Sequence, residues 1–150
     1  MNWKENIISD EAGMKALLAG TKTIAVLGIK TEAQSGQAAF YVADYLKNAG
    51  FDVIPVPVYY PDVKEILGRH VYRKLADIPG EIDMVNVFRR SEDVAPHLDD
   101  ILAKKPKSVW MQLGIRDDAV AEKLAQAGIK VVQNRCLMVD HRHLAHPSAR

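Results

Sequence analysis

The sequence predicts one α/β domain, in which a doubly wound, parallel five-stranded sheet lies between two layers of helices. The expected strand order is 3-2-1-4-5. Short apolar runs alternate along the chain with segments whose apolar residues recur at helical spacing, and glycines end most of these units. The 150 residues suffice for one domain with its own core. No repeat or linker divides them, so we expect residues 1–150 to form a single domain with its core over about residues 22–141.

Composition limits the partners. The chain has 20 Lys and Arg against 19 Asp and Glu, so no global charge attracts nucleic acid or an anionic membrane. Its one cysteine cannot form an internal disulfide, and no apolar run reaches the roughly 20 residues of a membrane span. We therefore expect a cytoplasmic protein, as a monomer or a homodimer.

The organising unit covers residues 22–50. An apolar run at residues 24–27 stops at Gly28, a polar loop follows, and apolar residues then return at helical spacing up to a stop at residues 48–50. A second run at residues 53–58 follows at once, so the two strands should be parallel and joined by a right-handed helical crossover. Gly28 and the helix start then lie at the carboxyl edge of the sheet, where backbone N–H groups and the helix dipole favour an anion.

Other elements flank this unit. Ser9 or Asp10 can cap a short helix that Gly20 ends. Residues 59–79 have weak periodicity and predict a long lid or binding loop over the strand ends, with helical turns near residues 63–67 and 75–79.

The second half repeats the alternation. Strands are expected at residues 82–88, 108–113 and 129–132. Ser91 should cap the helix between the first two of these, and Asp117 or Asp118 the helix between the last two, which Gly128 ends. Residues 136–139 can begin a terminal helix, and we expect the polar tail from residue 141 to 150 to fray.

In this strand order the ligand crevice lies between strands one and four, flanked by Gly28 and Gly114. A dinucleotide fits it poorly. The loop after Gly28 is not G-x-G-x-x-G, because Lys30 takes the place of the second glycine, and no Asp or Glu ends strand two to bind a ribose. Basic residues nevertheless gather at the strand ends, where each is either a solvated loop charge or a phosphate contact, and together they favour an anionic, nucleotide-like ligand. They are Lys30, Arg89, Arg90 and Arg116.

Several strings carry a family resemblance. They are I-A-V-L-G at residues 24–28, V-A-D-Y-L at 42–46, L-A-D-I-P at 75–79, V-F-R-R at 87–90, V-W-M-Q-L-G at 109–114 and R-C-L-M-V at 135–139. With them the chain resembles the small stand-alone CoA-binding proteins of bacteria and archaea. Their Rossmann-like fold is similar to the CoA-binding domain of the succinyl-CoA synthetase alpha subunit. The chain departs from that family where strand two ends Val56-Pro57-Val58 rather than V-N-P.

The resemblance implies coenzyme A, free or acylated, as the cofactor. It places the phosphates and pantetheine along the first loop, the adenine against the end of strand two, and the rest of the crevice along strands three and four. The implied binding residues are Gly28, Ile29, Lys30, Ser35, Gly36, Gln37, Val56, Pro57, Phe88, Arg89, Gln112, Leu113 and Gly114.

Catalysis is not expected. The related ligase draws on a histidine in a second domain and on a nucleotide-binding partner subunit, and we expect neither to be encoded in these 150 residues. Cys136 is either a structural cysteine or a thiol partner for CoA, and His141, His143 and His146 lack the spacing of a metal site. The sequence therefore predicts a CoA-binding or acyl-CoA-binding protein without catalytic activity of its own. Two alternatives stay open: an NAD(P)-binding or CoA-dependent enzyme component that works with a separate partner, and an interaction module with an empty crevice.

Overall fold

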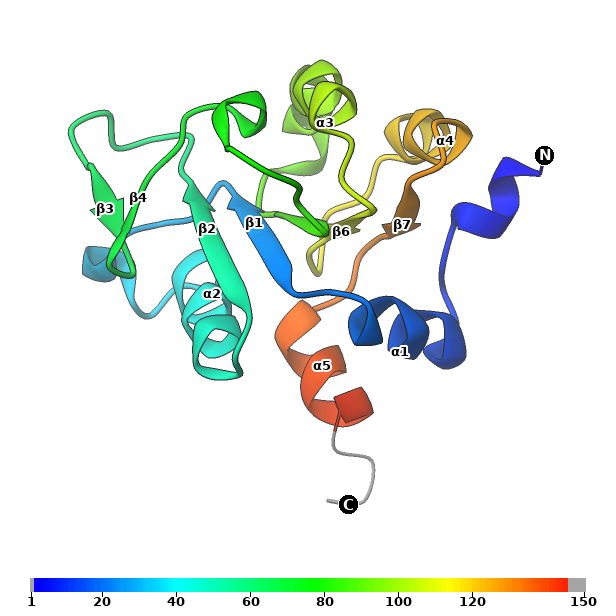
Figure 1. Cartoon of the computed structure of the whole chain (residues 1–150), viewed down its shortest axis with the longest axis horizontal. Coiled ribbons are helices and arrows are strands. Elements are labelled where there is room, and N and C mark those ends of the chain that lie inside the picture. The colour runs from blue at the N-terminus through cyan, green and yellow to red at the C-terminus, as the bar shows by residue number, and fades with distance from the viewer. Residues whose placement is uncertain (1, 146–150) are drawn as a thin grey trace.

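The computed structural model describes residues 2–145 and shows a five-stranded parallel sheet with helices on both faces (Figure 1). Its strands are β1 (Thr23–Leu27), β2 (Asp52–Val56), β5 (Met84–Val87), β6 (Ser108–Met111) and β7 (Lys130–Val132). The helices α1 (Glu11–Ala19), α2 (Ala38–Asn48) and α5 (Leu137–Ala145) cover one face, and α3 (Leu98–Lys104) and α4 (Asp118–Gln126) cover the other. The predicted fold class is confirmed.

The predicted strand order is wrong. The sheet runs β2-β1-β5-β6-β7, so the third strand of this sheet lies beside the first, not outside the second. Pro55 supplies the physical reason, because a proline cannot donate a ladder hydrogen bond and is tolerated in an edge strand. The winding direction therefore reverses between β1 and β5, and the ligand crevice of such sheets belongs there.

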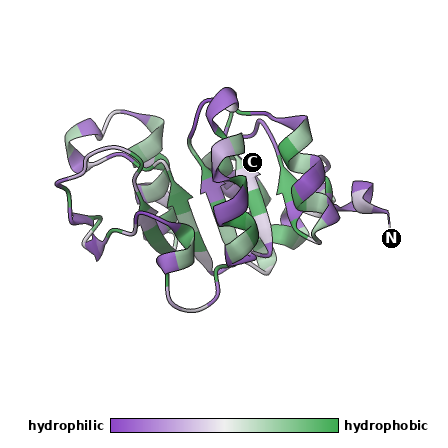
Figure 2. Cartoon of the chain, turned by 90° about the horizontal axis from the view of Figure 1, so that it is seen from above, coloured by the Kyte–Doolittle hydropathy of each residue, from purple (hydrophilic) through white to green (hydrophobic). Residues whose placement is uncertain are grey.

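Both sides of the sheet are buried. In β1, Ile24 and Val26 pack on the layer of α1, α2 and α5, whereas Ala25 and Leu27 pack on the layer of α3 and α4. Continuous apolar strands are expected for a parallel sheet covered on both faces. Figure 2 shows the same pattern, with green strands inside and purple concentrated in loops and outer helical turns.

Each outer edge of the sheet is covered. Along β2, the short hairpin of β3 (Glu65–Ile66) and β4 (Arg69–His70) is followed by Tyr72, whose N–H donates to the Pro55 carbonyl at 3.0 Å. Along β7, Ile7 forms a parallel bridge to Val131. The hairpin replaces the helical turn expected at residues 63–67, whereas a 3-10 turn does form at Leu75–Asp77.

Asp83 fixes the amino end of the sheet. Its carboxylate accepts from the N–H groups of Lys22 and Thr23 at 2.8 and 3.1 Å and pairs with Lys107 at 3.3 Å. Burial raises the pKa of Asp83, but these partners outweigh it and hold the pKa below its ordinary value. Asp83 therefore has a structural role at this end of the sheet.

Two helix boundaries differ from expectation. Ser91 does not cap a helix, because residues 91–97 form two 3-10 turns and α3 begins only at Leu98. The helix α5 continues through His141 and His143 to Ala145, where a frayed tail was expected, while His146 lies outside the described residues. Asp117 caps α4 as predicted, accepting from the Val120 N–H at 3.1 Å.

No helix among residues 2–145 is long and apolar enough to cross a membrane.

Candidate functional site: the crevice between β1 and β5

The strand ends of β1 and β5 meet at Gly28. Its N–H donates to the Val56 carbonyl at 2.8 Å, and the Phe88 N–H donates to the Leu27 carbonyl at 2.8 Å. Gly28 has a φ of +89°, and a Cβ there would come within 3.0 Å of the Phe88 carbonyl carbon and closer still to its oxygen. Only glycine allows the two backbones to approach this closely.

The loop after Gly28 divides into a buried and an exposed half. Ile29 is 1% exposed and belongs to the core, so its side chain does not line the crevice. Thr31 forms a capping box with Gln34. The loop then exposes Ser35, Gly36 and Gln37 to solvent.

The exposed half leads into the N-terminus of α2. Gln37 is the N-cap of this helix, yet its side chain makes no capping hydrogen bond, and its amide oxygen instead accepts from the Lys30 amine. The first N–H groups of an α-helix have no intrahelical partner, and they attract anions. This helix start carries the exposed part of the predicted site.

The end of β2 differs from the implied adenine contact. Val56 is 0% exposed and Pro57 is buried, so neither presents a side chain to a ligand. Tyr59, just beyond, is 58% exposed. Tyr59 was not among the predicted binding residues, although an aromatic residue just beyond a strand end was a usable sequence signal.

Arg89 is held in place at the end of β5. Its Nε donates to His97 Nε2 at 3.2 Å, its guanidinium lies 5.5 Å from the centre of the Tyr59 ring, and Asp93 is 4.0 Å away. Burial lowers the pKa of His97, and the neighbouring Arg89 lowers it further, so a neutral imidazole accepts this hydrogen bond. Arg90 by contrast has a side chain that is 74% exposed and pairs with Asp93 at 2.8 Å.

The Gln112 side chain is buried and connects elements of the fold. It is 5% exposed, and its Oε1 accepts from Asn86 Nδ2 and from the Leu137 N–H, both at 3.3 Å. Gln112 therefore links β5 and β6 to the start of α5, and the next residue, Leu113, is 66% exposed.

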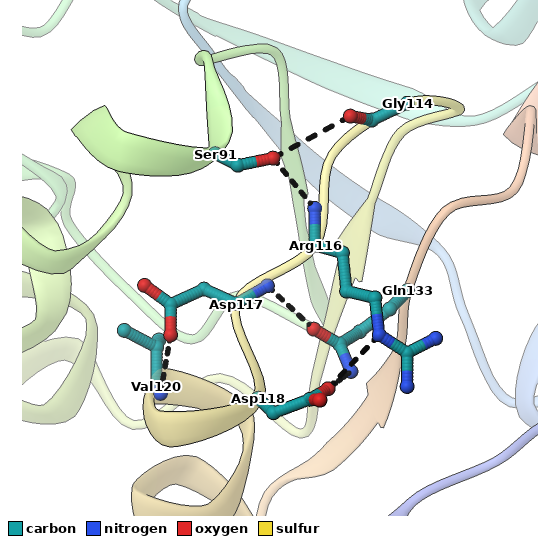
Figure 3. Close-up of polar contacts among 7 residues, drawn as sticks. All are labelled: Ser91, Gly114, Arg116, Asp117, Asp118, Val120 and Gln133. Carbon is teal, nitrogen blue, oxygen red and sulfur yellow. Dashed lines mark hydrogen bonds and ion pairs between the residues drawn. The ribbon is translucent and has the colours of Figure 1, made fainter.

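Gly114 belongs to a separate network that joins three loops (Figure 3). Ser91 Oγ accepts from the Arg116 N–H at 3.0 Å and lies 3.4 Å from the Gly114 carbonyl, while the Gly114 N–H donates to Asn134 at 2.7 Å. Beside it, the Arg116 side chain pairs with Asp118 at 3.0 Å. Since β5 lies between β1 and β6, the crevice is flanked by Gly28 and Phe88, and the expected pair of Gly28 and Gly114 is wrong.

The predicted residues thus fall into four groups. Gly28, Phe88 and Arg89 meet at the crevice, and Lys30 with residues 35–37 lies at the adjoining helix start. Ile29, Val56, Pro57 and Gln112 are buried supports. Leu113 and Gly114 lie one strand further along.

This arrangement accompanies a clear family match. Residues 22–142 match the model of a family described as "CoA binding domain". The chain belongs to the CoA-binding domain family. The match extends over both strands of the crevice, the β3–β4 hairpin and most of α5.

Known proteins resemble this chain in sequence or in fold. An uncharacterized protein of Bacillus subtilis (strain 168), YneT, is 31% identical over 131 residues, which are 87% of this chain and 93% of that protein. A solved Thermus thermophilus structure has a TM-score of 0.82 at 37% identity and covers 91% of this chain and 99% of its own. A dinucleotide-forming acetyl-coenzyme A synthetase from Ca. Korarchaeum cryptofilum shares the fold at 19% identity, with a TM-score of 0.62, over 73% of this chain and 25% of that one.

Proposed function

We propose that this chain binds coenzyme A or an acyl-CoA in the crevice between β1 and β5 and has no catalytic activity of its own. The observation that carries the proposal is the close approach of Gly28 to Phe88 beside the uncapped start of α2, in a chain of the CoA-binding domain family. The diphosphate of CoA matches the exposed N–H groups of the helix start, and Lys30 adds a positive charge.

The polar groups around the crevice support binding better than catalysis. Arg89 is held in place by His97, Tyr59 and Asp93, and the Gln112 side chain accepts a hydrogen bond from the start of α5. Neither set contains a side-chain nucleophile hydrogen-bonded to a base, which is the arrangement typical of covalent acyl transfer. A binding protein that buffers, carries or senses CoA fits these residues.

The experiment compares CoA, acetyl-CoA, NAD, NADP and ATP in a thermal-shift panel. A ligand at one hundred times its dissociation constant adds about 2.7 kcal/mol to the free energy of unfolding, so CoA and acetyl-CoA should raise the melting temperature clearly. Stabilisation by NAD or NADP instead would favour the enzyme-component alternative. Absence of stabilisation by all five would favour the interaction module.

Substitution of two arginines at the end of β5 tests where CoA binds. Arg89→Ala should weaken CoA binding about tenfold and flatten its salt dependence, since one charge-assisted contact is worth roughly 1.4 kcal/mol here. Arg90→Ala is the control, because Arg90 stands at the same strand end with its side chain in solvent. Equal affinities of the two variants, measured by isothermal titration calorimetry at two salt concentrations, would remove Arg89 from the site.

A further inference from the structure

The Arg89 side chain lies across the crevice and is held in place from three sides. Its Cδ is 3.3 Å from the position that a Cβ on Gly28 would occupy, so its stem covers the close approach of β1 and β5. Its Nη2 lies 4.0 Å from Asp93, its Nη1 lies 3.4 Å from the Tyr59 hydroxyl, and its Nε donates to His97 Nε2 at 3.2 Å. The hydrogen bond to His97 is the shortest of these three polar contacts. His97 therefore has the largest influence on where the guanidinium points.

This hydrogen bond defines the protonation state in which His97 can hold Arg89. An arginine side chain keeps all its protons in proteins, so Arg89 Nε is always the donor and His97 Nε2 must supply a lone pair. A neutral imidazole with its proton on Nδ1 meets this requirement. An imidazolium carries a proton on both nitrogens, so it cannot accept, and its positive charge repels the guanidinium.

The surroundings of His97 favour the neutral ring. Burial lowers the pKa of His97 from its ordinary value of 6.5, and the charge of Arg89 lowers it further. The ring also stands directly before the first turn of α3, where the helix dipole disfavours a positive charge. Asp93 and Asp100 face His97 and act in the opposite direction, but both carboxylates already accept hydrogen bonds from other groups. A neutral His97 that charges in acid results from this balance.

We propose that His97 is a positioning residue, whose neutral ring orients Arg89 toward the phosphates of the ligand and whose protonation in acid releases Arg89 and weakens binding. The inference rests on the proposed function and adds a regulation of the same site. Its sign follows from the direct contact, because the charged ring would face the guanidinium at hydrogen-bond distance. A ligand phosphate that touched His97 itself would favour the charged ring and give the opposite sign.

Isothermal titration calorimetry with CoA between pH 8 and pH 5, at constant ionic strength, tests the proposal. Phosphate groups of CoA titrate in the same range, so the native chain is compared with His97→Gln at each pH. The glutamine oxygen can accept from Arg89 but does not titrate. Between pH 8 and pH 5 the native chain should lose about tenfold more affinity than His97→Gln. His70→Gln is the matched control, because His70 is an exposed histidine of β4, and this variant should follow the native chain.

Two further measurements separate positioning from a merely structural role. His97→Leu removes the acceptor without adding a charge, so at pH 8 it should bind CoA about tenfold more weakly than His97→Gln while both remain folded by circular dichroism. Equal affinities of these two variants would overturn the positioning role. In the ligand-free protein at pH 8, nitrogen NMR of the imidazole ring should show an unprotonated Nε2 on His97. A proton on that nitrogen would overturn the proposal without reference to any ligand.

Separate outcomes distinguish this inference from the proposed function. CoA binding with the same pH dependence in the native chain and in His97→Gln would overturn the role of His97 and leave the proposed function intact. A native affinity that rises in acid relative to His97→Gln would also overturn that role, because the ligand would then contact the charged ring itself. Absence of CoA binding by the native chain at every pH would overturn both proposals.

Discussion

Replacing Gly28 by alanine tests whether the backbones of β1 and β5 are as close as described. The left-handed φ of +89° costs an L-residue about 1–2 kcal/mol, and forcing a methyl group against the Phe88 carbonyl adds about 1–3 kcal/mol. Gly28→Ala should therefore lower the free energy of unfolding by about 2–5 kcal/mol, a large share of the roughly 5–15 kcal/mol of a typical domain. A bulkier residue, such as valine in Gly28→Val, would harm folding as well as binding and would not test the binding site alone.

Two other glycines separate the cost of the left-handed backbone from the cost of the close contact. Gly114 has a φ of +87° but open space at its Cβ position, so Gly114→Ala should cost about 1–2 kcal/mol from the backbone alone. Gly36 has neither constraint, and Gly36→Ala should stay within about 0.5 kcal/mol. Urea unfolding followed by circular dichroism measures all three. If Gly28→Ala were no more destabilising than Gly114→Ala, the close approach at the crevice would be refuted.

Three further substitutions probe charged groups. Asp83→Asn should lower the free energy of unfolding by about 1–3 kcal/mol at pH 7. Because the pKa of Asp83 is lowered on folding, the difference in stability between the native chain and the variant should shrink as the pH falls below about 4, and a pH-independent difference in urea midpoints would contradict this. Arg135→Met leaves the buried Asp140 carboxylate without its partner at 2.6 Å, and should lower the free energy of unfolding by about 2 kcal/mol, less than the loss from a fully buried pair. An unchanged melting temperature would show that the pair contributes nothing to stability. Burial first and the neighbouring Arg89 second lower the pKa of His97, so stability should fall as the pH drops through about 6.5 toward that pKa. His97→Gln should weaken this dependence between pH 8 and pH 5, and an unchanged slope would show that folding does not lower the pKa of His97.

The sequence predicted the elements better than their arrangement. The five strands and the helices α1, α2 and α4 follow from apolar periodicity, caps and glycine stops, because these signals are local. The strand order depends on contacts distant in sequence, and periodicity does not report them. Pro55 was the one local clue, since a proline in the middle of the second strand belongs at an edge.

The site shows the same limit. Gly28, Arg89 and the helix start at residues 35–37 lie where sequence reasoning placed a ligand, because they depend on the strand-to-helix turn itself. Burial was not visible from the sequence, so Ile29, Val56 and Gln112 were taken as ligand contacts although they support the fold from inside.

The two covered borders of the sheet restrict how copies of this protein can associate. Adding a strand from another molecule would require the β3–β4 hairpin to leave β2, and even then Pro55 offers no N–H to a newcomer. On the far side the N-terminal segment already occupies β7 at Val131. Pairing of copies at these two borders is therefore disfavoured, which leaves the sheet resistant to the edge-to-edge stacking that begins aggregation.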